Sequence, residues 1–250
     1  MYDYFLGGKD NYYGDREAAD KIMAKAPDAP GACRANRAFL GRAVRFVACQ
    51  GVQQFIDIGA GLPTQGNVHE VAHQVAPESR IVYVDNDPIV LAHGRALLPK
   101  DDTIAIIDAD MRQPHAILDH PATAKLIDFS QPLAVLFVAA LHFVTDEEDP
   151  AGIIRAFGER MAPGSYLILS HDTTEGHAGE LLELGKDVYR HATSPMNFRS
   201  REEILLFFGD FELVPPGVTP LNQWRPDNLA EANQPGAHWL LAGVGRRKDK

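Results

Sequence analysis

The sequence is poor in cysteine and has no long apolar run. Its two cysteines, Cys33 and Cys49, fall within one predicted helix, which would hold them about 24 Å apart. A disulfide needs Cα atoms within about 7 Å of each other, so no bridge can form within that helix. No apolar stretch approaches the roughly 20 residues of a membrane span, and the start of the chain shows no signal-peptide pattern. We therefore expect a cytoplasmic protein in a reducing compartment.

Positive charge is also scarce. The chain has 24 Lys and Arg residues against 34 Asp and Glu residues, a formal net charge of −10. This balance disfavours non-specific binding to nucleic acid or to an anionic membrane. His69, His73 and His93 lie on predicted helices without a matching cysteine or carboxylate pattern, so we expect no metal site. A small-molecule substrate, or else a protein substrate, fits this composition better.

Internal repeats and low-complexity stretches are absent, so the fold class must be derived from the order of strand and helix patterns. Short apolar runs alternate with helical patterns along most of the chain. This alternation predicts one Rossmann-like, doubly wound α/β domain over residues 1–250, with a mostly parallel seven-stranded sheet and an antiparallel hairpin at its edge. The predicted strands cover residues 54–58, 80–84, 103–107, 133–138, 165–170, 211–214 and 238–244.

The first 14 residues are rich in aromatic residues, glycine and asparagine and show no helical period. We expect an ordered arm there, followed by helices over residues 15–26 and 31–50. The arm and the first helix, residues 1–30, form an N-terminal extension that we expect to act as a lid.

Two later segments are expected to complete a substrate pocket. Residues 172–199 follow the fifth predicted strand and should lie on the substrate side of the sheet. The loop around Trp224 and Arg225 should contribute to the same roof. Their mixed aromatic and polar composition suggests a modest organic molecule as the substrate.

A glycine turn directly follows the first predicted strand. In this segment Asp57 is followed by Gly59 and Gly61, and glycines there allow a tight turn and a close approach of a ligand. The next two strands lead to Asp85 and Asp110. A lone Gly-x-Gly is weak evidence, but acidic residues after three successive strands are much more specific. Asp85 is well placed to accept hydrogen bonds from ribose hydroxyls, and Asp110 lies where an adenine ring would be.

The spacing of the glycines discriminates between cofactors. A dinucleotide fingerprint needs a third glycine, but Thr64 occupies that position. A pyrophosphate would also sit badly beside Asp57, whereas a sulfonium cofactor with an ammonium group would be favoured by nearby carboxylates. The pattern therefore disfavours a nicotinamide dehydrogenase and favours S-adenosylmethionine.

At these residues the sequence resembles class I S-adenosylmethionine-dependent methyltransferases, and more narrowly the actinobacterial S-adenosyl methyltransferase family, formerly a domain of unknown function. A more distant resemblance, through QFIDIGAGL, is to the leucine carboxyl and polyketide methyltransferase group. The similarity covers nearly the whole chain. It is carried by YDYFLGGKDNYYGDREAAD, ANRAFLGRAVRF, QFIDIGAGLPTQGNVHEVA, IVYVDNDPIVLAHGRALL, DADMRQP and MAPGSYLILSH.

The resemblance implies a set of cofactor-binding residues, with S-adenosylmethionine as donor and S-adenosylhomocysteine as product. They are Asp57, Gly59 and Gly61 in the methionine-side loop, Asp85 and Asn86 at the ribose, Asp110 and Met111 at the adenine, and Val138 and Ala139 at the methionine moiety. Independently of the resemblance, Arg34 and Arg37 of the second predicted helix could be surface charges, or one of them could bind the cofactor carboxylate, and we assign Arg34 to this role. The fourth strand lacks an Asn-Pro-Pro-Tyr type signature, which leaves the methyl acceptor open.

Catalytic candidates are few. His142 follows the fourth strand, where an imidazole could take a proton from a hydroxyl or amine acceptor, but a packing role is equally open to it. In the arm, Asn11 is assigned to the cofactor and Tyr13 to catalysis, with packing over the sheet edge as the alternative. Without a strong catalytic signature, a regulatory protein that binds S-adenosylmethionine without transferring methyl groups remains the second hypothesis.

Overall fold

The computed structural model describes residues 1–63, 66–99, 101–189 and 194–248. Its centre is a mostly parallel sheet with the strand order β3-β2-β1-β4-β5-β8-β6, in which the short strand β7 also pairs with β8. Strand β8 runs antiparallel to β5, β6 and β7. The strands are β1 (Gln54–Ile58), β2 (Arg80–Asp85), β3 (Ile104–Asp108), β4 (Ala134–Val138), β5 (Tyr166–Asp172), β6 (Phe211–Leu213), β7 (Thr219–Pro220) and β8 (Leu240–Arg247).

This topology confirms the predicted Rossmann-like α/β fold with an antiparallel edge. The chain order reverses between β1 and β4, and in such sheets ligands bind beyond the carboxyl ends of the strands at this switch point. The two-residue strand β7 is an addition to the seven expected strands. Thr64, which bears on the choice of cofactor, lies outside the described residues.

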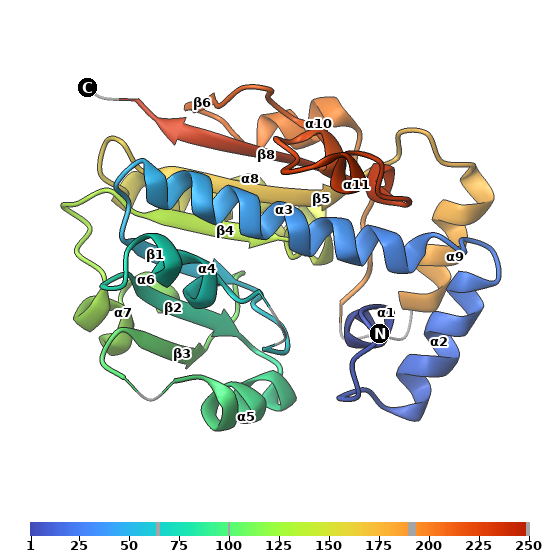
Figure 1. Ribbon diagram of the computed structural model, residues 1–250, viewed down its shortest axis with the longest axis horizontal. Helices are drawn as coiled ribbons and strands as arrows, with labels where there is room; N and C mark the ends of the chain where they lie inside the picture. The colour runs from blue at the N-terminus through green and yellow to red at the C-terminus, as the bar shows by residue number, and fades with distance from the viewer. Residues whose placement is uncertain (64–65, 100, 190–193, 249–250) are drawn as a thin grey trace.

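Helices cover both faces of the sheet, as Figure 1 shows. The central strands β1 and β4 are buried almost throughout, which explains their continuous apolar sequence. Helices α3 and α4 pack on one face, and α6, α7, α8 and α10 lie on the other. The helices of these layers are α3 (Ala29–Cys49), α4 (Val68–Val75), α5 (Pro88–Leu97), α6 (Pro114–Leu118), α7 (Pro121–Leu126), α8 (Pro150–Arg160) and α10 (Arg201–Leu206). Each large apolar side chain fully buried between the layers contributes about 1.5–3 kcal/mol.

The long helix α3 joins the sheet to the N-terminal part of the chain. It begins after Asp28 with Pro30 in its first turn, and it ends at Cys49 before Gly51, whose φ of +90° is left-handed. It starts two residues before the expected position. Its first half extends past the carboxyl ends of the strands (Figure 1), so one helix contributes both to the core and to whatever binds at that edge.

Three helices gather beyond the carboxyl ends of the strands. They are α1 (Tyr2–Phe5), α2 (Tyr13–Met23) and α9 (Gly179–Tyr189), and Figure 1 shows them beside the first half of α3. Together with residues 194–198 we call them the cap. The expectation that residues 1–14 lack helical structure is wrong for α1, which forms a single turn. Among the described residues, no helix is both long and apolar enough to cross a membrane.

The loop around Trp224 packs on α3 outside the cavity lining. Trp224 is fully buried and meets Phe39 edge-on, with ring centroids 5.4 Å apart. Arg42 of α3 donates from Nε to the carbonyl oxygen of Trp224 at 2.9 Å. The expectation that the loop around Trp224 and Arg225 roofs the substrate pocket is therefore wrong, because this loop completes the core instead.

Candidate functional site

A cavity of about 620 Å³ lies between the carboxyl ends of the strands and the cap. Its sheet end is formed by the turns after β1, β2, β3 and β4. Its cap end is formed by α1, α2, α9, residues 194–198 and the first half of α3, which runs along the whole cavity. The residues named below as lining the cavity all belong to one continuous space.

Two left-handed glycines shape the turn after β1. Gly59 has a φ of +71° and Gly61 a φ of +65°, a region in which side chains are strained. The Gly59 amide donates to the carbonyl oxygen of Val84 in β2 at 2.9 Å, and a Cβ at position 59 would lie 2.8 Å from that of Ala140. The turn therefore lies close to the strand ends and leaves open space on its cavity side.

The carboxylate of Asp85, at the end of β2, connects two turns. It accepts hydrogen bonds from the Gly61 amide and from the Asp87 amide, both at 2.9 Å. Burial raises the pKa of Asp85, and these amide donors oppose that rise. A carboxylate has about four acceptor positions, so Asp85 can still accept hydrogen bonds from a ligand in the cavity.

Asp57 lies deeper, on β1, and is only 5% exposed. Burial raises its pKa to about 7, while the positive charge of Arg37 opposes the rise and the carboxylate of Asp85 adds to it. Arg37 also lines the cavity, with its guanidinium 6.0 Å from the centre of the Tyr2 ring. The positive charge of Arg37 thus acts both on the buried acid Asp57 and on Tyr2 of the arm.

The loop after β3 holds its acidic residue away from the cavity. Asp110 accepts hydrogen bonds from the backbone amide of Arg112 at 2.9 Å and from its guanidinium at 3.2 Å. Asn86 also donates to Asp110, at 3.3 Å. Asn86, Met111 and Arg112 line the cavity, whereas Asp110 does not. Asp110 therefore fixes the conformation of this loop through Arg112.

A chain of hydrogen bonds connects the arm to the turn after β4. Ala139 has a φ of +55°, and its amide donates to Oγ of Ser170 at 2.9 Å. The Ser170 hydroxyl donates to Oδ1 of Asn36 at 2.6 Å, and the amide of Asn36 donates to the Tyr2 hydroxyl at 3.0 Å. Tyr2 in turn donates to the carbonyl oxygen of Cys33 at 3.1 Å. The strained turn at Ala139 is thus tied to α3 and α1.

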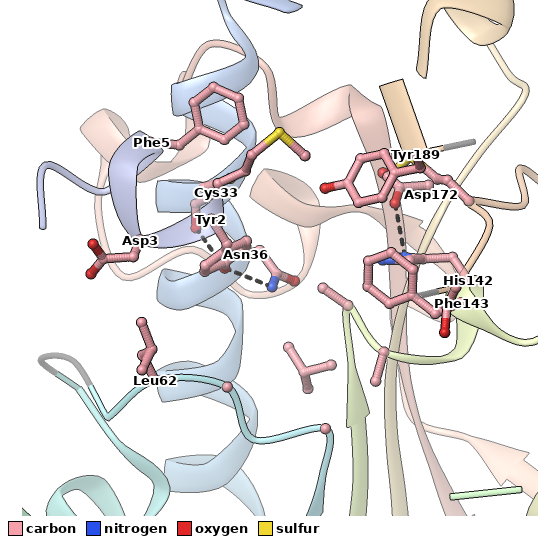
Figure 2. A pocket seen from close by; sticks show the side chains of 18 of the residues that line it. Tyr2, Asp3, Phe5, Cys33, Asn36, Leu62, His142, Phe143, Asp172 and Tyr189 are labelled. Atoms are coloured by element: carbon pink, nitrogen blue, oxygen red, sulfur yellow. Dashed lines mark hydrogen bonds and ion pairs between the residues drawn. The ribbon is translucent and has the colours of Figure 1, made fainter. Parts of the chain in front are cut away.

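His142 and Asp172 form a buried pair in the wall of the cavity. Nδ1 of His142 lies 2.8 Å from Oδ2 of Asp172, and the two side chains are 4% and 10% exposed. His142 belongs to a short 3-10 turn after β4, and Asp172 ends β5, so adjacent parallel strands bring them together. Figure 2 shows the pair with Phe143 and Tyr189 around it.

The neighbouring His171 has a structural environment. Its Nε2 is 2.7 Å from the guanidinium of Arg199, and its Nδ1 is 2.7 Å from the carbonyl oxygen of Asp172. Burial, assisted by His142, lowers the pKa of His171 to about 3. A neutral His171 accepts a hydrogen bond from Arg199, which also donates to the carboxylate of Asp146 at 2.7 Å. This network anchors residue 199 beside the end of β5.

The arm folds on itself around a buried carboxylate. Asp3, which lines the cavity, accepts from the Asn11 amide at 2.8 Å, and the same amide donates to the Gly8 carbonyl oxygen at 2.9 Å. A side chain at Gly8 would collide with the Asp3 carboxylate. Asn11 thus stabilises the fold of the arm without lining the cavity. Tyr13 is 75% exposed and lies outside the cavity lining.

The structure brings most of the sequence-predicted site residues into one cavity. Those that line it are Asp57, Gly59, Gly61, Asp85, Asn86, Met111, Val138, Ala139 and His142. Those that do not are Arg34, Asp110, Asn11 and Tyr13. Arg34 is exposed on the outer side of α3.

Sequence reasoning missed Asn36, Ser170 and Tyr189. Asn36 could have been found, because it precedes Phe39 and Leu40 by three and four residues and thus falls on the buried face of the predicted helix. A buried amide on such a face needs hydrogen-bond partners. No local signal marks Tyr189, whose position depends on how α9 packs.

Comparisons with known proteins give a family match and two close structural relatives. Residues 1–248 match the S-adenosyl methyltransferase family. A candidate methyltransferase from Thermobifida fusca is 43% identical, with a TM-score of 0.92 over 99% of this chain and 93% of that one. A DUF574 family protein from Streptomyces avermitilis is 41% identical, with a TM-score of 0.92 over 98% and 95% of the two chains.

More distant structures share the fold alone. The 1,6-didemethyltoxoflavin-N1-methyltransferase of Burkholderia thailandensis, solved with 1,6-didemethyltoxoflavin and S-adenosylhomocysteine, is 14% identical with a TM-score of 0.51, over 84% of this chain and 79% of that one. No curated protein matches the chain in sequence. The match over residues 1–248 and the two close structural relatives show that the chain belongs to the S-adenosyl methyltransferase family.

Proposed function

We propose that this chain transfers a methyl group from S-adenosylmethionine to a small-molecule acceptor bound in the same cavity. The observation that carries the proposal is the continuity of the cavity, which extends from the glycine turn and Asp85 to the buried pair His142 and Asp172. The distant toxoflavin methyltransferase supports it by analogy, since its structure holds a small ring compound together with S-adenosylhomocysteine.

The residues at the sheet end fit the cofactor. Asp85 would accept hydrogen bonds from the ribose hydroxyls, while Asn86 and Met111 would contact the adenine. Asp57 and Arg37 provide opposite charges for the ammonium and carboxylate groups of the methionine part. The left-handed turn at Gly59 and Gly61 leaves open space for a close approach, as a Cβ at position 61 would meet nothing within 4 Å. Asp110 would act only by shaping its loop.

The bound cofactor supplies an activated methyl group, so the protein needs mainly to align the acceptor and exclude water. We assign this exclusion to the cap, with residues 1–30 as the lid and residues 172–199 on the acceptor side. Tyr2, Asp3 and Phe5 of the arm line the cavity opposite Tyr189 of α9. The single domain and the lid are part of this proposal.

Calorimetric titration with S-adenosylhomocysteine tests the cofactor assignment. Asp85→Ala should weaken binding by about 1.5–3 kcal/mol, as expected for losing hydrogen bonds to a charged acceptor. Asp102→Ala is the matched control, because the side chain of Asp102 is 94% exposed and remote from the cavity lining. Equal affinities of the two variants would remove Asp85 from the site. Failure of both S-adenosylmethionine and S-adenosylhomocysteine to bind at millimolar concentration would overturn the proposed function.

A separate assay distinguishes an enzyme from a regulatory protein. The protein is incubated with S-adenosylmethionine and an extract of small metabolites, and S-adenosylhomocysteine is measured by mass spectrometry. Donor consumption that depends on the extract supports a methyltransferase. Tight binding without any consumption would instead favour the regulatory alternative.

A further inference from the structure

We infer that the methyl acceptor is an uncharged aromatic hydroxyl compound, held at the cap end with its hydroxyl against His142, which takes the proton while Asp172 positions the imidazole. This inference rests on the proposed function and names the acceptor class and the proton acceptor that the function leaves open. Four features of the cap end carry it: the buried pair, the scarcity of unpaired cations, the aromatic walls and the neutrality of the thiol and phenol groups.

The pair His142 and Asp172 places an imidazole beside a carboxylate. Nδ1 of His142 lies 2.8 Å from Oδ2 of Asp172, which is the distance of an ion pair, although the two groups are not aligned for a hydrogen bond. The negative charge beside Nδ1 favours a hydrogen on that nitrogen and leaves the lone pair on Nε2. Both side chains line the cavity and are almost entirely buried. An imidazole held in one tautomer by a carboxylate is suited to accept a proton from a bound hydroxyl.

The positive charges argue against an anionic acceptor. Among the described residues that line the cavity, the cationic groups are the guanidinium groups of Arg37 and Arg112 and the ammonium group of Met1, which lies 3.0 Å from the Asp15 carboxylate. Arg37 interacts electrostatically with Asp57, and Arg112 donates to Glu148 at 2.7 Å and to Asp110 at 3.2 Å. A carboxylate or phosphate acceptor beside Asp172 would therefore be buried next to a negative charge without a cation of its own.

The walls of the cap end fit a flat apolar molecule. Phe143 and Tyr189 stand with ring centroids 5.6 Å apart on the side of His142, and Phe5 lies across the cavity from them (Figure 2). Apolar residues of α9 and of the following segment complete the enclosure. They are Leu181, Leu184, Met196 and Phe198. A ring packed among these side chains buries apolar area on both of its faces.

The thiol and phenol groups at this end stay protonated. Burial raises the pKa of Cys33 to about 12, and burial also raises the pKa values of Tyr2 and Tyr189, with the charge of Asp172 adding to each rise. These groups supply no competing base at neutral pH. Among the thiol, phenol and imidazole groups of the described residues that line this end, His142 is therefore the one that can take a proton from an acceptor hydroxyl.

The acidity of the acceptor favours an aromatic hydroxyl over an alkyl one. A phenol has an ordinary pKa of about 10, and water one of about 15.7. Proton transfer from a phenol to His142 is thus far less unfavourable than from an alkyl hydroxyl, whose acidity is close to that of water. The aromatic walls favour the same choice.

The reaction balances in atoms and charge. The hydroxyl proton of the acceptor passes to Nε2 of His142, and an oxygen electron pair forms the new bond to the methyl carbon. The bond between that carbon and the sulfonium sulfur breaks, and its electron pair stays on sulfur, which becomes the neutral thioether of S-adenosylhomocysteine. The products are an aryl methyl ether and a protonated His142, which releases its proton to solvent when the cavity opens.

The test uses two pairs of probes that differ only in the reacting group. These are 2-naphthol with 2-naphthoate, and 4-phenylphenol with 4-phenylbenzoate. Binding is measured by fluorescence in the presence of S-adenosylhomocysteine, which cannot donate a methyl group, and turnover is measured with S-adenosylmethionine. We expect the naphthol or the phenylphenol to bind more tightly than its carboxylate partner and to be converted to its methyl ether.

Variants then separate chemistry from binding. His142→Gln should bind the hydroxyl probe with unchanged affinity but turn it over at least 100-fold more slowly. Asp172→Asn should lower kcat with little change in KM, since the Asn side chain occupies the same space but favours the wrong tautomer. His115→Gln, at an exposed position outside the cavity lining, is the matched control and should behave as the wild type.

Each other outcome contradicts a definite part of the proposal. Preference for the carboxylate probes, or binding of neither hydroxyl probe while S-adenosylhomocysteine still binds, would overturn the acceptor class and leave the proposed function standing. Turnover in His142→Gln equal to that of His115→Gln would overturn the role of His142. Absence of cofactor binding in the wild type would overturn the proposed function itself.

Discussion

The two ends of the cavity are built in different ways. At the sheet end, Asp57, Gly59 and Asp85 lie on strands or directly after them, and the register of β1 with β2 sets their spacing. At the cap end, the lining comes from α1, α3, α9 and the loops after β4 and β5, which meet through packing and through side-chain contacts between distant parts of the chain. A regular scaffold therefore presents the residues that we propose bind the cofactor, while helices and loops packed against it form the wall where we propose that the acceptor binds.

The largest expected effect concerns Arg37, which we propose, in place of Arg34, as the arginine that binds the cofactor carboxylate. Arg37→Ala should weaken binding of S-adenosylhomocysteine by about 1.5–3 kcal/mol, because Arg37 lines the cavity beside Asp57 and a hydrogen bond to the cofactor carboxylate would be charge-assisted. Arg34→Ala is the matched control on the same helix and should bind as the wild type. Isothermal titration calorimetry measures both. Weakening in Arg34→Ala alone would restore the sequence-based assignment.

A smaller effect is expected from the protonation of Asp57 at the sheet end. Because burial raises its pKa to about 7, the group is mostly protonated at pH 6 and mostly ionised at pH 8. The ammonium group of the cofactor favours the ionised form, so affinity for S-adenosylhomocysteine should rise about tenfold over this range, with release of a proton on binding. Titrations in buffers of different ionisation enthalpy measure both quantities.

Two further observations check the role of Asp57. The rise in affinity should disappear in Asp57→Asn, and a rise that persists in this variant would assign the titration to another group. In the protein without cofactor, the pH dependence of folding stability runs opposite to that of cofactor affinity. The folded state binds a proton that the unfolded state has released, so the contribution of Asp57 to stability should fall as the pH rises from about 4 to 7.

The smallest expected effect lies in the cap. Asn11→Ala removes a donor from the buried carboxylate of Asp3 and should loosen the arm, increasing its proteolysis and weakening cofactor binding a few-fold. Tyr13→Phe should change neither, because Tyr13 is exposed. Limited proteolysis with and without S-adenosylhomocysteine measures the first effect, and calorimetry the second. An arm that remains equally protected in both variants would mean that Asn11 does not hold it.

Much of the sheet end could be predicted from the sequence. Parallel strands in register bring their carboxyl ends to one edge, so acidic residues after successive strands must lie near one another whatever covers them. Asp57 and Asp85 were located in this way. The rule is less exact for Asp110, because Arg112, two residues later, turns its carboxylate away from the cavity.

Helix periodicity could have refined the prediction on α3. Cys33, Asn36, Arg37 and Leu40 follow the spacing i, i+3, i+4 and i+7 and line the cavity together, whereas Arg34 falls outside this stripe. The sequence alone does not show which side of α3 faces the cavity. That depends on what α3 packs against, so the sequence could narrow the choice to Arg34 or Arg37 without deciding it.

By itself the sequence determined the alternation of strands and helices, the glycine turn and the acidic strand ends, because these depend on local patterns and on the geometry of parallel sheets. Only the tertiary structure decided the cap end. The hydrogen bond from Ser170 to Asn36 spans 134 residues, and the approach of His142 to Asp172 depends on two different strand ends. Such contacts are set by the packing of whole elements, and no local pattern encodes the distance between elements that are far apart along the chain.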